Sequence, residues 1–206
     1  MSTLPPQALL FDLGGVLIEI DFERALQSWE PLSRLAPADM RRRFGLDEAY
    51  RRHERGEIDG AQYFAHLAAR LELDASDDQI RAGWNSIFVG EITETTALVL
   101  AARARLPCSA FSNTNAVHLQ AFSARFPAVN AAFDTLFLSH ELACRKPERA
   151  AFDLVARRLG VAAPAILFFD DLADNVAAAI DAGLQAVLVR SPADVRQALL
   201  SRGLIA

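Results

Sequence analysis

The segment ALLFDLGGVL (residues 8–17) contains both a candidate central strand and a candidate reactive group. Its apolar run from Ala8 to Leu13 is interrupted only by Asp12 and is followed by the pair Gly14-Gly15. A short and nearly continuous apolar run is typical of a strand that is buried on both faces of a parallel sheet. The segment therefore predicts a buried strand that ends in a carboxylate.

Strands and helices alternate along the chain after residue 90. Short apolar runs predict strands at 108–112, 133–138, 166–169 and 186–189, and segments of helical periodicity separate them. Such alternation implies right-handed crossovers and a parallel sheet. Residues 21–90, by contrast, have helical periodicity throughout. The expected fold is α/β: a Rossmann-like doubly wound parallel sheet (1–20 and 91–206) with a helical cap (21–90) inserted after the first strand.

Composition excludes several classes of protein. The 206 residues carry 21 basic and 26 acidic side chains, a net charge of −5, and 52% are hydrophobic. The acidic balance argues against a nucleic-acid binder, and the arginine clusters at 41–43 and 51–52 are expected to be solvated helix faces. No apolar run approaches the roughly 20 residues of a membrane span, and residues 1–15 lack a signal-peptide pattern. With two cysteines and no disulfide framework, we expect a cytoplasmic protein, either monomer or dimer.

One count in the composition is unusual. Of the 21 basic residues, 20 are arginine and only one, Lys146, is lysine. A coding bias toward arginine explains the count, and composition alone leaves open whether chance or function retained this lysine. Lys146 follows the third predicted strand among acidic strand ends, where a compact ammonium suits a place between a carboxylate and a phosphate oxygen. Its position therefore favours function.

Four of the predicted strands deliver polar residues at their carboxyl ends, where ligands bind in open α/β sheets. Asp12 ends the first strand, Ser112-Asn113 ends the second, and Asp170-Asp171 ends the fourth. Asp174 and Asn175 follow shortly after the fourth strand. Four carboxylates at one mouth need a cation, and Mg²⁺ suits them because it keeps water and phosphate oxygens among its ligands. A metal, a lysine and neutral donors beside one carboxylate describe phosphoryl transfer to an aspartate.

These residues resemble the motifs of the haloacid dehalogenase superfamily. The resemblance covers nearly the whole chain and rests on four segments: Phe11–Leu17, Ser112-Asn113, Lys146-Pro147, and Phe169–Asp171 with Asn175. A closer resemblance is to the bacterial glucose-1-phosphate phosphatase-like branch with a helical cap. It rests on Asp21-Phe22, His53–Ile58, Ser112–Asn115, Arg145–Glu148, and Phe168–Asp171 with Ala173–Asn175.

The resemblance implies a role for each matched residue. Asp12 would attack phosphorus and form an aspartyl-phosphate, and Lys146 would offset the charge on Asp12 and the phosphoryl group. Mg²⁺ would be held by Asp12, the backbone carbonyl of Gly14 and Asp171, with Asp170 as a direct or water-mediated partner. Ser112, Asn113 and Lys146 would hold phosphate oxygens, and Asp174 and Asn175 would support the site. The implied substrate is a small phosphorylated metabolite of the sugar phosphate class, such as glucose 1-phosphate.

One position departs from the common pattern of these phosphatases. Gly14 stands where most of them have a second Asp, the general acid and base, whose help is typically worth about 10²–10⁴-fold. Glu19, His53 and Glu54 are candidates for a substitute acid. The cap segment His53-Glu54-Arg55 is also a candidate for contact with substrate.

The glycine keeps two alternatives open. A metal-independent 2-haloacid dehalogenase expels halide, which needs no proton, and a non-catalytic phosphometabolite-binding protein needs no acid. A metal-free site has little reason to gather Asp170 and Asp171 beside Asp12, and the intact nucleophile and lysine argue against a mere binder. A Mg²⁺-dependent phosphatase is therefore the favoured hypothesis. The sequence leaves the substrate, the substitute acid, the specificity residues of the cap and the oligomeric state undetermined.

Overall fold

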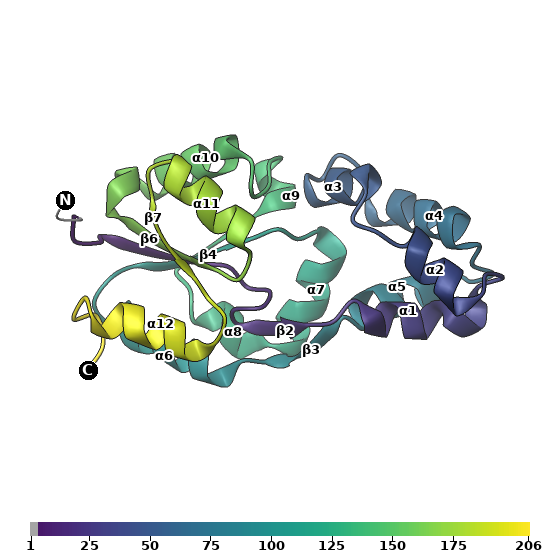
Figure 1. Cartoon of the computed structure of the whole chain (residues 1–206), viewed down its shortest axis with the longest axis horizontal. Coiled ribbons are helices and arrows are strands. Elements are labelled where there is room, and N and C mark those ends of the chain that lie inside the picture. Colours follow the sequence, from purple (N-terminus) through teal and green to yellow (C-terminus); the bar gives the residue numbers. More distant parts are fainter. Residues whose placement is uncertain (1–3) are drawn as a thin grey trace.

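A five-stranded parallel sheet forms the centre of the molecule in the computed structural model, which describes residues 4–206 (Figure 1). The strand order is β5-β4-β1-β6-β7, with β1 in the middle. The bounds are β1 Ala8–Phe11, β4 Cys108–Ser112, β5 Thr135–Leu138, β6 Ile166–Asp170 and β7 Gln185–Leu188. The predicted α/β class with a parallel sheet is confirmed, and the four strands expected after residue 90 are present within a few residues of their predicted bounds.

Alternation along the strands buries the sheet on both faces. Leu9 and Phe11 of β1 belong to one hydrophobic cluster, and Leu10 between them belongs to another. The first cluster includes residues of α6 and α12, and the second includes residues of α10 and α11, so helices cover both faces. The helices of this part are α6 Thr93–Arg103, α7 Ala116–Arg125, α8 Pro127–Ala131, α9 Ser139–Leu142, α10 Arg149–Leu159, α11 Ala173–Asp181 and α12 Pro192–Leu200, with a short 3₁₀ turn, η2 Ala163–Ala165.

Five helices lie to one side of the sheet (Figure 1). They are α1 Glu23–Trp29, α2 Pro37–Arg43, α3 Glu48–Glu54, α4 Gly60–Leu71 and α5 Asp77–Asn85, with a 3₁₀ turn, η1 Glu30–Leu32, after α1. Two of them begin with a capping box, in which Asp59 pairs with Gln62 and Ser76 pairs with Gln79. Such a box satisfies the free N–H groups of a first turn, so these starts were readable from the sequence.

A two-stranded antiparallel ribbon joins this helical part to the sheet. Strand β2 (Ile18–Ile20) leads into the helices and pairs with β3 (Phe88–Glu91), which leads out of them. The expectation that residues 21–90 are all helical is therefore wrong over 88–90, because the ribbon pairing is a non-local contact. The division into a core (1–20 and 91–206) and an inserted cap (21–90) stays a prediction.

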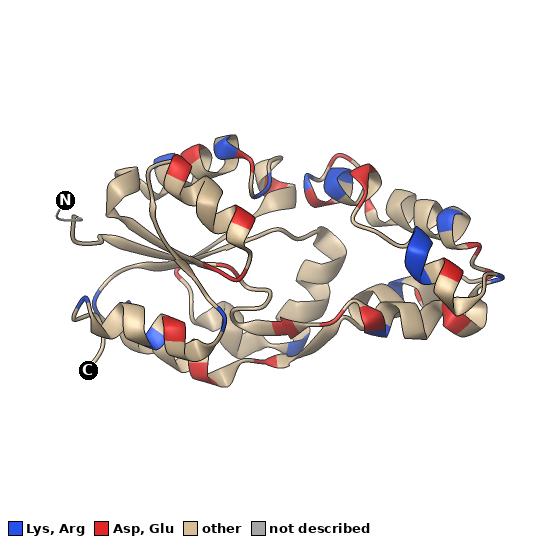
Figure 2. Ribbon diagram, viewed as in Figure 1, with Lys and Arg blue, Asp and Glu red and all other residues tan. Residues whose placement is uncertain are grey.

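The arginine clusters of the helical part are paired with acids. Figure 2 shows basic and acidic positions interspersed along α2 and α3. Arg41 pairs with Glu23, Arg43 with Glu72, and Arg52 with Glu57, all with partly exposed side chains. The arrangement agrees with the predicted solvated helix faces. Among the described residues, no helix has both the length and the apolar character needed to cross a membrane.

Candidate active site

Three carboxylates meet at the carboxyl ends of two neighbouring strands. Asp12 follows β1, Asp170 ends β6 and Asp171 comes next, and each offers an oxygen within 4.8 Å of the others. The predicted convergence of these three residues is observed. Asp174 does not join them, contrary to expectation, because it lies exposed on the first turn of α11.

The single lysine lies at the centre of this carboxylate cluster. The Nζ atom of Lys146 is 2.9 Å from Asp12 Oδ1 and 2.6 Å from Asp170 Oδ2, and only 1% of its side chain is exposed. The rings of Phe111 and Phe168 lie 5.2 and 5.3 Å from the same atom. A buried cation needs such partners, because an unpaired charge away from water is very costly. The two carboxylates therefore fix the position of the ammonium.

Asp170 and Asp171 have different surroundings. Asp170 is fully buried and accepts hydrogen bonds from Lys146, from the Asn175 side chain at 2.9 and 3.1 Å, and from the backbone N–H of Leu172 at 2.9 Å. Its oxygens are thus largely occupied by protein donors. Asp171 is half-buried, lines the cavity described below and is the less committed carboxylate.

The three carboxylates carry more negative charge than the single ammonium of Lys146 offsets. Burial, together with Asp170 and Asp171, raises the pKa of Asp12 to about 7, although Lys146 acts in the opposite direction. Burial and the charge of Asp170 likewise raise the pKa of Asp171. Hard carboxylate oxygens in this number, with room for water and phosphate, fit Mg²⁺. A divalent cation there would favour the ionised forms of both residues.

Glycine is required at position 15 for two reasons. Gly15 has a φ of +70°, and a Cβ atom built on it would lie 2.2 Å from Asp171 Oδ2. The turn after β1 therefore brings its backbone directly against the carboxylate cluster. Gly14 lines the same cavity and contributes no side chain, so the structure places no second acid there.

The four residues of Ser112–Asn115 make different contacts, three through their side chains and Thr114 through its backbone. Ser112 is at the end of β4 and lines the cavity. Asn113 donates to the carbonyl of Lys146 and accepts from its N–H, both at 2.8 Å, so its amide holds the lysine loop. Thr114 exchanges hydrogen bonds with the Ser139 hydroxyl, and Asn115 caps α7. Besides these two bonds, Asn113 retains its backbone N–H and the second hydrogen of its amide as donors for a phosphate.

A cavity of about 340 Å³ opens above the carboxylate cluster, between the sheet and the helical part. Asp12, Ser112 and Lys146 lie among its lining residues. Apolar side chains from both parts also line it, namely Ile18, Ile20, Phe22, Leu46, Ile87, Phe88, Phe122 and Leu172. Tyr50, Glu54 and Arg145 add polar groups. Tyr50 is expected from the sequence to pack in the helical bundle and Arg145 is not a predicted site residue, since nothing in either pattern separates a cavity residue from a packing one.

The three candidate cap residues, His53, Glu54 and Arg55, lie in different places relative to the cavity. His53 is buried, its ring stacks on Tyr63 at 4.7 Å between centroids, and it does not line the cavity. Burial lowers the pKa of His53, so its ring is neutral. Arg55 also lies outside the cavity lining and pairs with three glutamates. Only Glu54 reaches the cavity.

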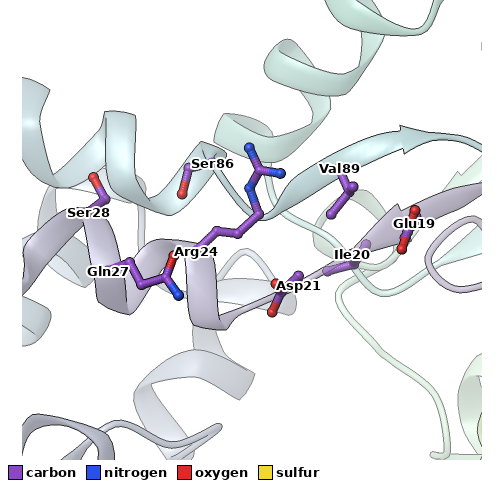
Figure 3. A pocket seen from close by; sticks show the side chains of 8 residues that line it. All are labelled: Glu19, Ile20, Asp21, Arg24, Gln27, Ser28, Ser86 and Val89. Atoms are coloured by element: carbon purple, nitrogen blue, oxygen red, sulfur yellow. The ribbon is translucent and has the colours of Figure 1, made fainter.

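Glu19, another candidate acid, lies in a separate hollow. Figure 3 shows this hollow along β2, the start of α1 and the beginning of β3, with Glu19, Asp21 and Arg24 among its side chains. Glu19 is absent from the lining of the cavity that contains Asp12. It is therefore not placed to serve that cavity.

Comparisons with known proteins agree with this geometry. A family model described as haloacid dehalogenase-like hydrolase matches residues 6–183. A phosphatase of Mycobacterium tuberculosis, MT3486, is 28% identical over 94% of this chain and 91% of its own. The D-ribitol-5-phosphate phosphatase of Bacteroides thetaiotaomicron is 25% identical over 93% of this chain and 95% of its own.

Solved structures give the same picture. A Bacteroides thetaiotaomicron enzyme of the same family, bt-2542, crystallised with magnesium and inorganic phosphate, superposes with a TM-score of 0.80 at 29% identity, covering 90% of this chain and 94% of its own. The L-2-haloacid dehalogenase of Xanthobacter autotrophicus superposes with a TM-score of 0.65 at 22% identity, covering 98% and 84%. The latter likeness concerns the fold alone.

Proposed function

The chain belongs to the haloacid dehalogenase-like hydrolases, and from this premise we propose that it is a Mg²⁺-dependent phosphatase of small phosphorylated metabolites. The observation that carries the proposal is the cluster itself: Asp12 and Asp171 share one edge of the cavity with a buried lysine. A site that works without metal has little reason to gather Asp170 and Asp171 beside its nucleophile. The cluster thus favours the phosphatase over the metal-free alternative.

Asp12 acts as the nucleophile in this proposal. Its carboxylate attacks phosphorus, the bond to the ester oxygen breaks and that oxygen takes a proton from water, and a second water then hydrolyses the aspartyl-phosphate to inorganic phosphate and free Asp12. Lys146 holds Asp12 in place and offsets negative charge on the phosphoryl group. Ser112 and the N–H of Asn113 bind phosphate oxygens, and Asn175 supports Asp170. Asp174, exposed on α11, keeps no direct part in this scheme.

The residues that would hold Mg²⁺ are Asp12, the carbonyl of Gly14 and Asp171, with Asp170 nearby. When bound, the ion supplies positive charge that offsets the carboxylates and the phosphoryl oxygens. Asp170 stays committed mainly to Lys146, Asn175 and Leu172. We therefore assign it to holding the lysine and place Asp171 first among the added ligands.

A sugar or polyol phosphate is the proposed substrate class. The D-ribitol-5-phosphate phosphatase among the relatives supports this class, and glucose 1-phosphate, the substrate of the resembling branch, remains one candidate within it. The helices of residues 21–90 act as a cap over the cavity. A cavity of about 340 Å³ suits a small molecule and disfavours a macromolecular substrate.

A phosphatase panel with and without metal tests the proposal. Purified protein is assayed on a set of sugar, polyol and alkyl phosphates with Mg²⁺ and with EDTA, beside Asp12→Asn. We expect turnover with Mg²⁺, its loss in EDTA, and a fall of at least about 10³-fold in Asp12→Asn, because the nucleophile is removed. The control is Asp153→Asn, a partly exposed carboxylate on α10 that should behave as wild type.

Two outcomes would contradict the mechanism. Equal turnover in EDTA would show that the reaction needs no metal. An active Asp12→Asn variant would show that Asp12 is not the nucleophile. Release of chloride from 2-chloropropionate without metal would establish the dehalogenase instead.

A further inference from the structure

The charged side chains of the cavity fall into two sets. Asp12, Lys146 and Asp171 belong to the carboxylate cluster, and the remaining two, Glu54 and Arg145, pair with each other. The second set has no part in the chemistry described above. It also joins two segments far apart in the chain, since Glu54 ends α3 and Arg145 precedes the catalytic lysine.

The guanidinium of Arg145 donates a hydrogen bond from one of its three nitrogens. Its Nε donates to Glu54 Oε2 at 2.6 Å, and its backbone N–H donates to Glu148 at 3.3 Å. Over residues 4–206, neither terminal amino group of the guanidinium has a hydrogen-bond partner. Arginine presents its donors in a rigid planar fork, so fixing Nε also fixes the direction of the other donors. Arg145 thus brings oriented and unused donors to the cavity.

Glu54 has the features of a residue that orients another. Only 2% of it is exposed, and Arg145 is the one cation within salt-bridge distance in the described chain. Tyr50 lies beside it, and burial with the nearby Glu54 charge raises the pKa of the phenol well above its usual value. A buried carboxylate without a cation would be strongly destabilising, so the pair holds together.

The charge balance indicates what Arg145 can bind. Glu54 already offsets the charge of Arg145, and Asp12 with Asp170 offsets that of Lys146. A second anionic group on the substrate would therefore meet no uncompensated cation. Neutral hydroxyl oxygens fit the open donors better, while apolar neighbours such as Phe22 and Phe88 can pack against C–H groups.

We propose that Arg145 binds hydroxyl oxygens of the leaving group and selects polyhydroxylated phosphate esters, and that Glu54 is the positioning residue that aims it. This inference rests on the proposed function, because it assigns specificity at the same site. It gives the cap a defined part in substrate choice: α3 supplies the carboxylate that orients a donor of the core.

Two six-carbon phosphate esters test the inference. D-sorbitol 6-phosphate carries hydroxyl groups along its chain and n-hexyl phosphate carries none. Arg145→Met should raise KM for sorbitol 6-phosphate about 10–100-fold with kcat nearly unchanged, the loss typical of hydrogen bonds to a charged donor, and should change hexyl phosphate by less than about threefold. Glu54→Gln should also raise KM for sorbitol 6-phosphate selectively, but by a smaller factor. Arg145→Lys should bind sorbitol 6-phosphate more tightly than Arg145→Met does.

Binding measurements separate this inference from the proposed function. Calorimetry with Mg²⁺ compares the dissociation constants of sorbitol 6-phosphate and inorganic phosphate in wild type, Arg145→Met and the control Arg149→Met, an exposed arginine on α10. We expect Arg145→Met to weaken sorbitol 6-phosphate alone and Arg149→Met to weaken neither.

Equal weakening of both ligands, or equal kinetic losses on both esters, would overturn the inference and give Arg145 a purely structural part in the lysine loop. Selective weakening in a protein that hydrolyses no ester would support the inference and reject the phosphatase.

Discussion

At the scale of single residues, each cation of the cavity is matched by carboxylates before any ligand arrives. Lys146 is shared by Asp12 and Asp170, and Arg145 is held by Glu54. Asp171 is left without a cation partner among the described residues, and the pKa of Asp12 stays raised. A phosphate dianion would add to this excess of negative charge. The residues themselves thus call for a divalent ion together with the substrate.

Lys146→Arg should lose most activity although the charge is kept. The ammonium lies within 2.9 Å of one carboxylate and 2.6 Å of another and is packed against two phenylalanine rings, and a planar guanidinium is wider than this space. We expect kcat to fall at least about 10²-fold, the scale of losing one oriented charged donor at the reacting centre. Steady-state assays with Mg²⁺ measure it, with far-UV circular dichroism as the check on folding. Turnover near that of wild type would make the single lysine an accident of coding.

The sequence located the clustered charged residues better than the contacts that support them. Asp12, Lys146 and Asp171 follow from one rule, that the carboxyl ends of parallel strands share an edge. The same rule grouped Asp174 with them, whereas its exposed side chain lines a neighbouring hollow with Asn113 and Lys146 and is not part of the three-carboxylate cluster. The clamp of Asn113 on Lys146 joins residues 33 positions apart through backbone atoms, and no pattern of residue types encodes such a contact.

At the scale of elements, the helical part depends on close packing between α1 and α5. Trp29 and Trp84 are fully buried and stack with centroids 6.4 Å apart, and the Trp29 indole donates to the carbonyl of Ile80. A Cβ atom on Gly83 would lie 2.1 Å from the Trp29 indole nitrogen. Glycine is therefore required in the interior of α5, where it would otherwise be unfavourable.

Gly83→Ala should destabilise the protein despite the better helix propensity of alanine. Overpacking of this kind costs about 1–3 kcal/mol, which in a chain of this size lowers Tm by roughly 2–10 °C. Gly45→Ala is the matched control, because no atom lies within 4 Å of its added Cβ. Thermal unfolding followed by circular dichroism compares the two. A Gly83→Ala protein as stable as wild type would show that Trp29 can move aside at little cost.

Local signals located most elements, and non-local contacts account for the misses. Asp59 and Ser76 begin helices with their own capping boxes, so a few neighbouring residues sufficed. Strand β3 has no such signal: it is extended because it pairs with β2, about 70 residues earlier. Its first residues therefore read as the end of a helical segment.

At the scale of the whole molecule, the helical part contacts the sheet part beside the lysine loop through two ion pairs. Glu54 pairs with Arg145, and Arg55 pairs with Glu148 at 3.3 Å. Next to them, Gly56 has a φ of +70°, and a Cβ atom built on it would lie 2.5 Å from the carbonyl oxygen of His140 in α9. The end of α3 is thus pressed against the segments that flank the lysine.

A double-mutant cycle tests whether the outer pair helps to hold the two parts together. Arg55→Gln and Glu148→Gln should each raise KM about two- to fivefold, the scale of a partly exposed ion pair, and do so alike for hydroxylated and alkyl esters. The double variant should be little worse than either single one, because the same contact is lost. Steady-state assays on sorbitol 6-phosphate and hexyl phosphate measure all four proteins. Additive losses would show that the two residues act separately.

The burial of Lys146 also determines how the surface reacts with reagents for lysine side chains. The chain has one lysine, and that lysine is enclosed, so the folded surface presents guanidinium groups but no lysine ammonium. Acetylation, ubiquitin attachment and lysine-directed dyes would find no side-chain target while Lys146 stays buried. Acylation of that one amine would require the packing around Lys146 to open transiently. The rate of such labelling would therefore measure how often this opening occurs.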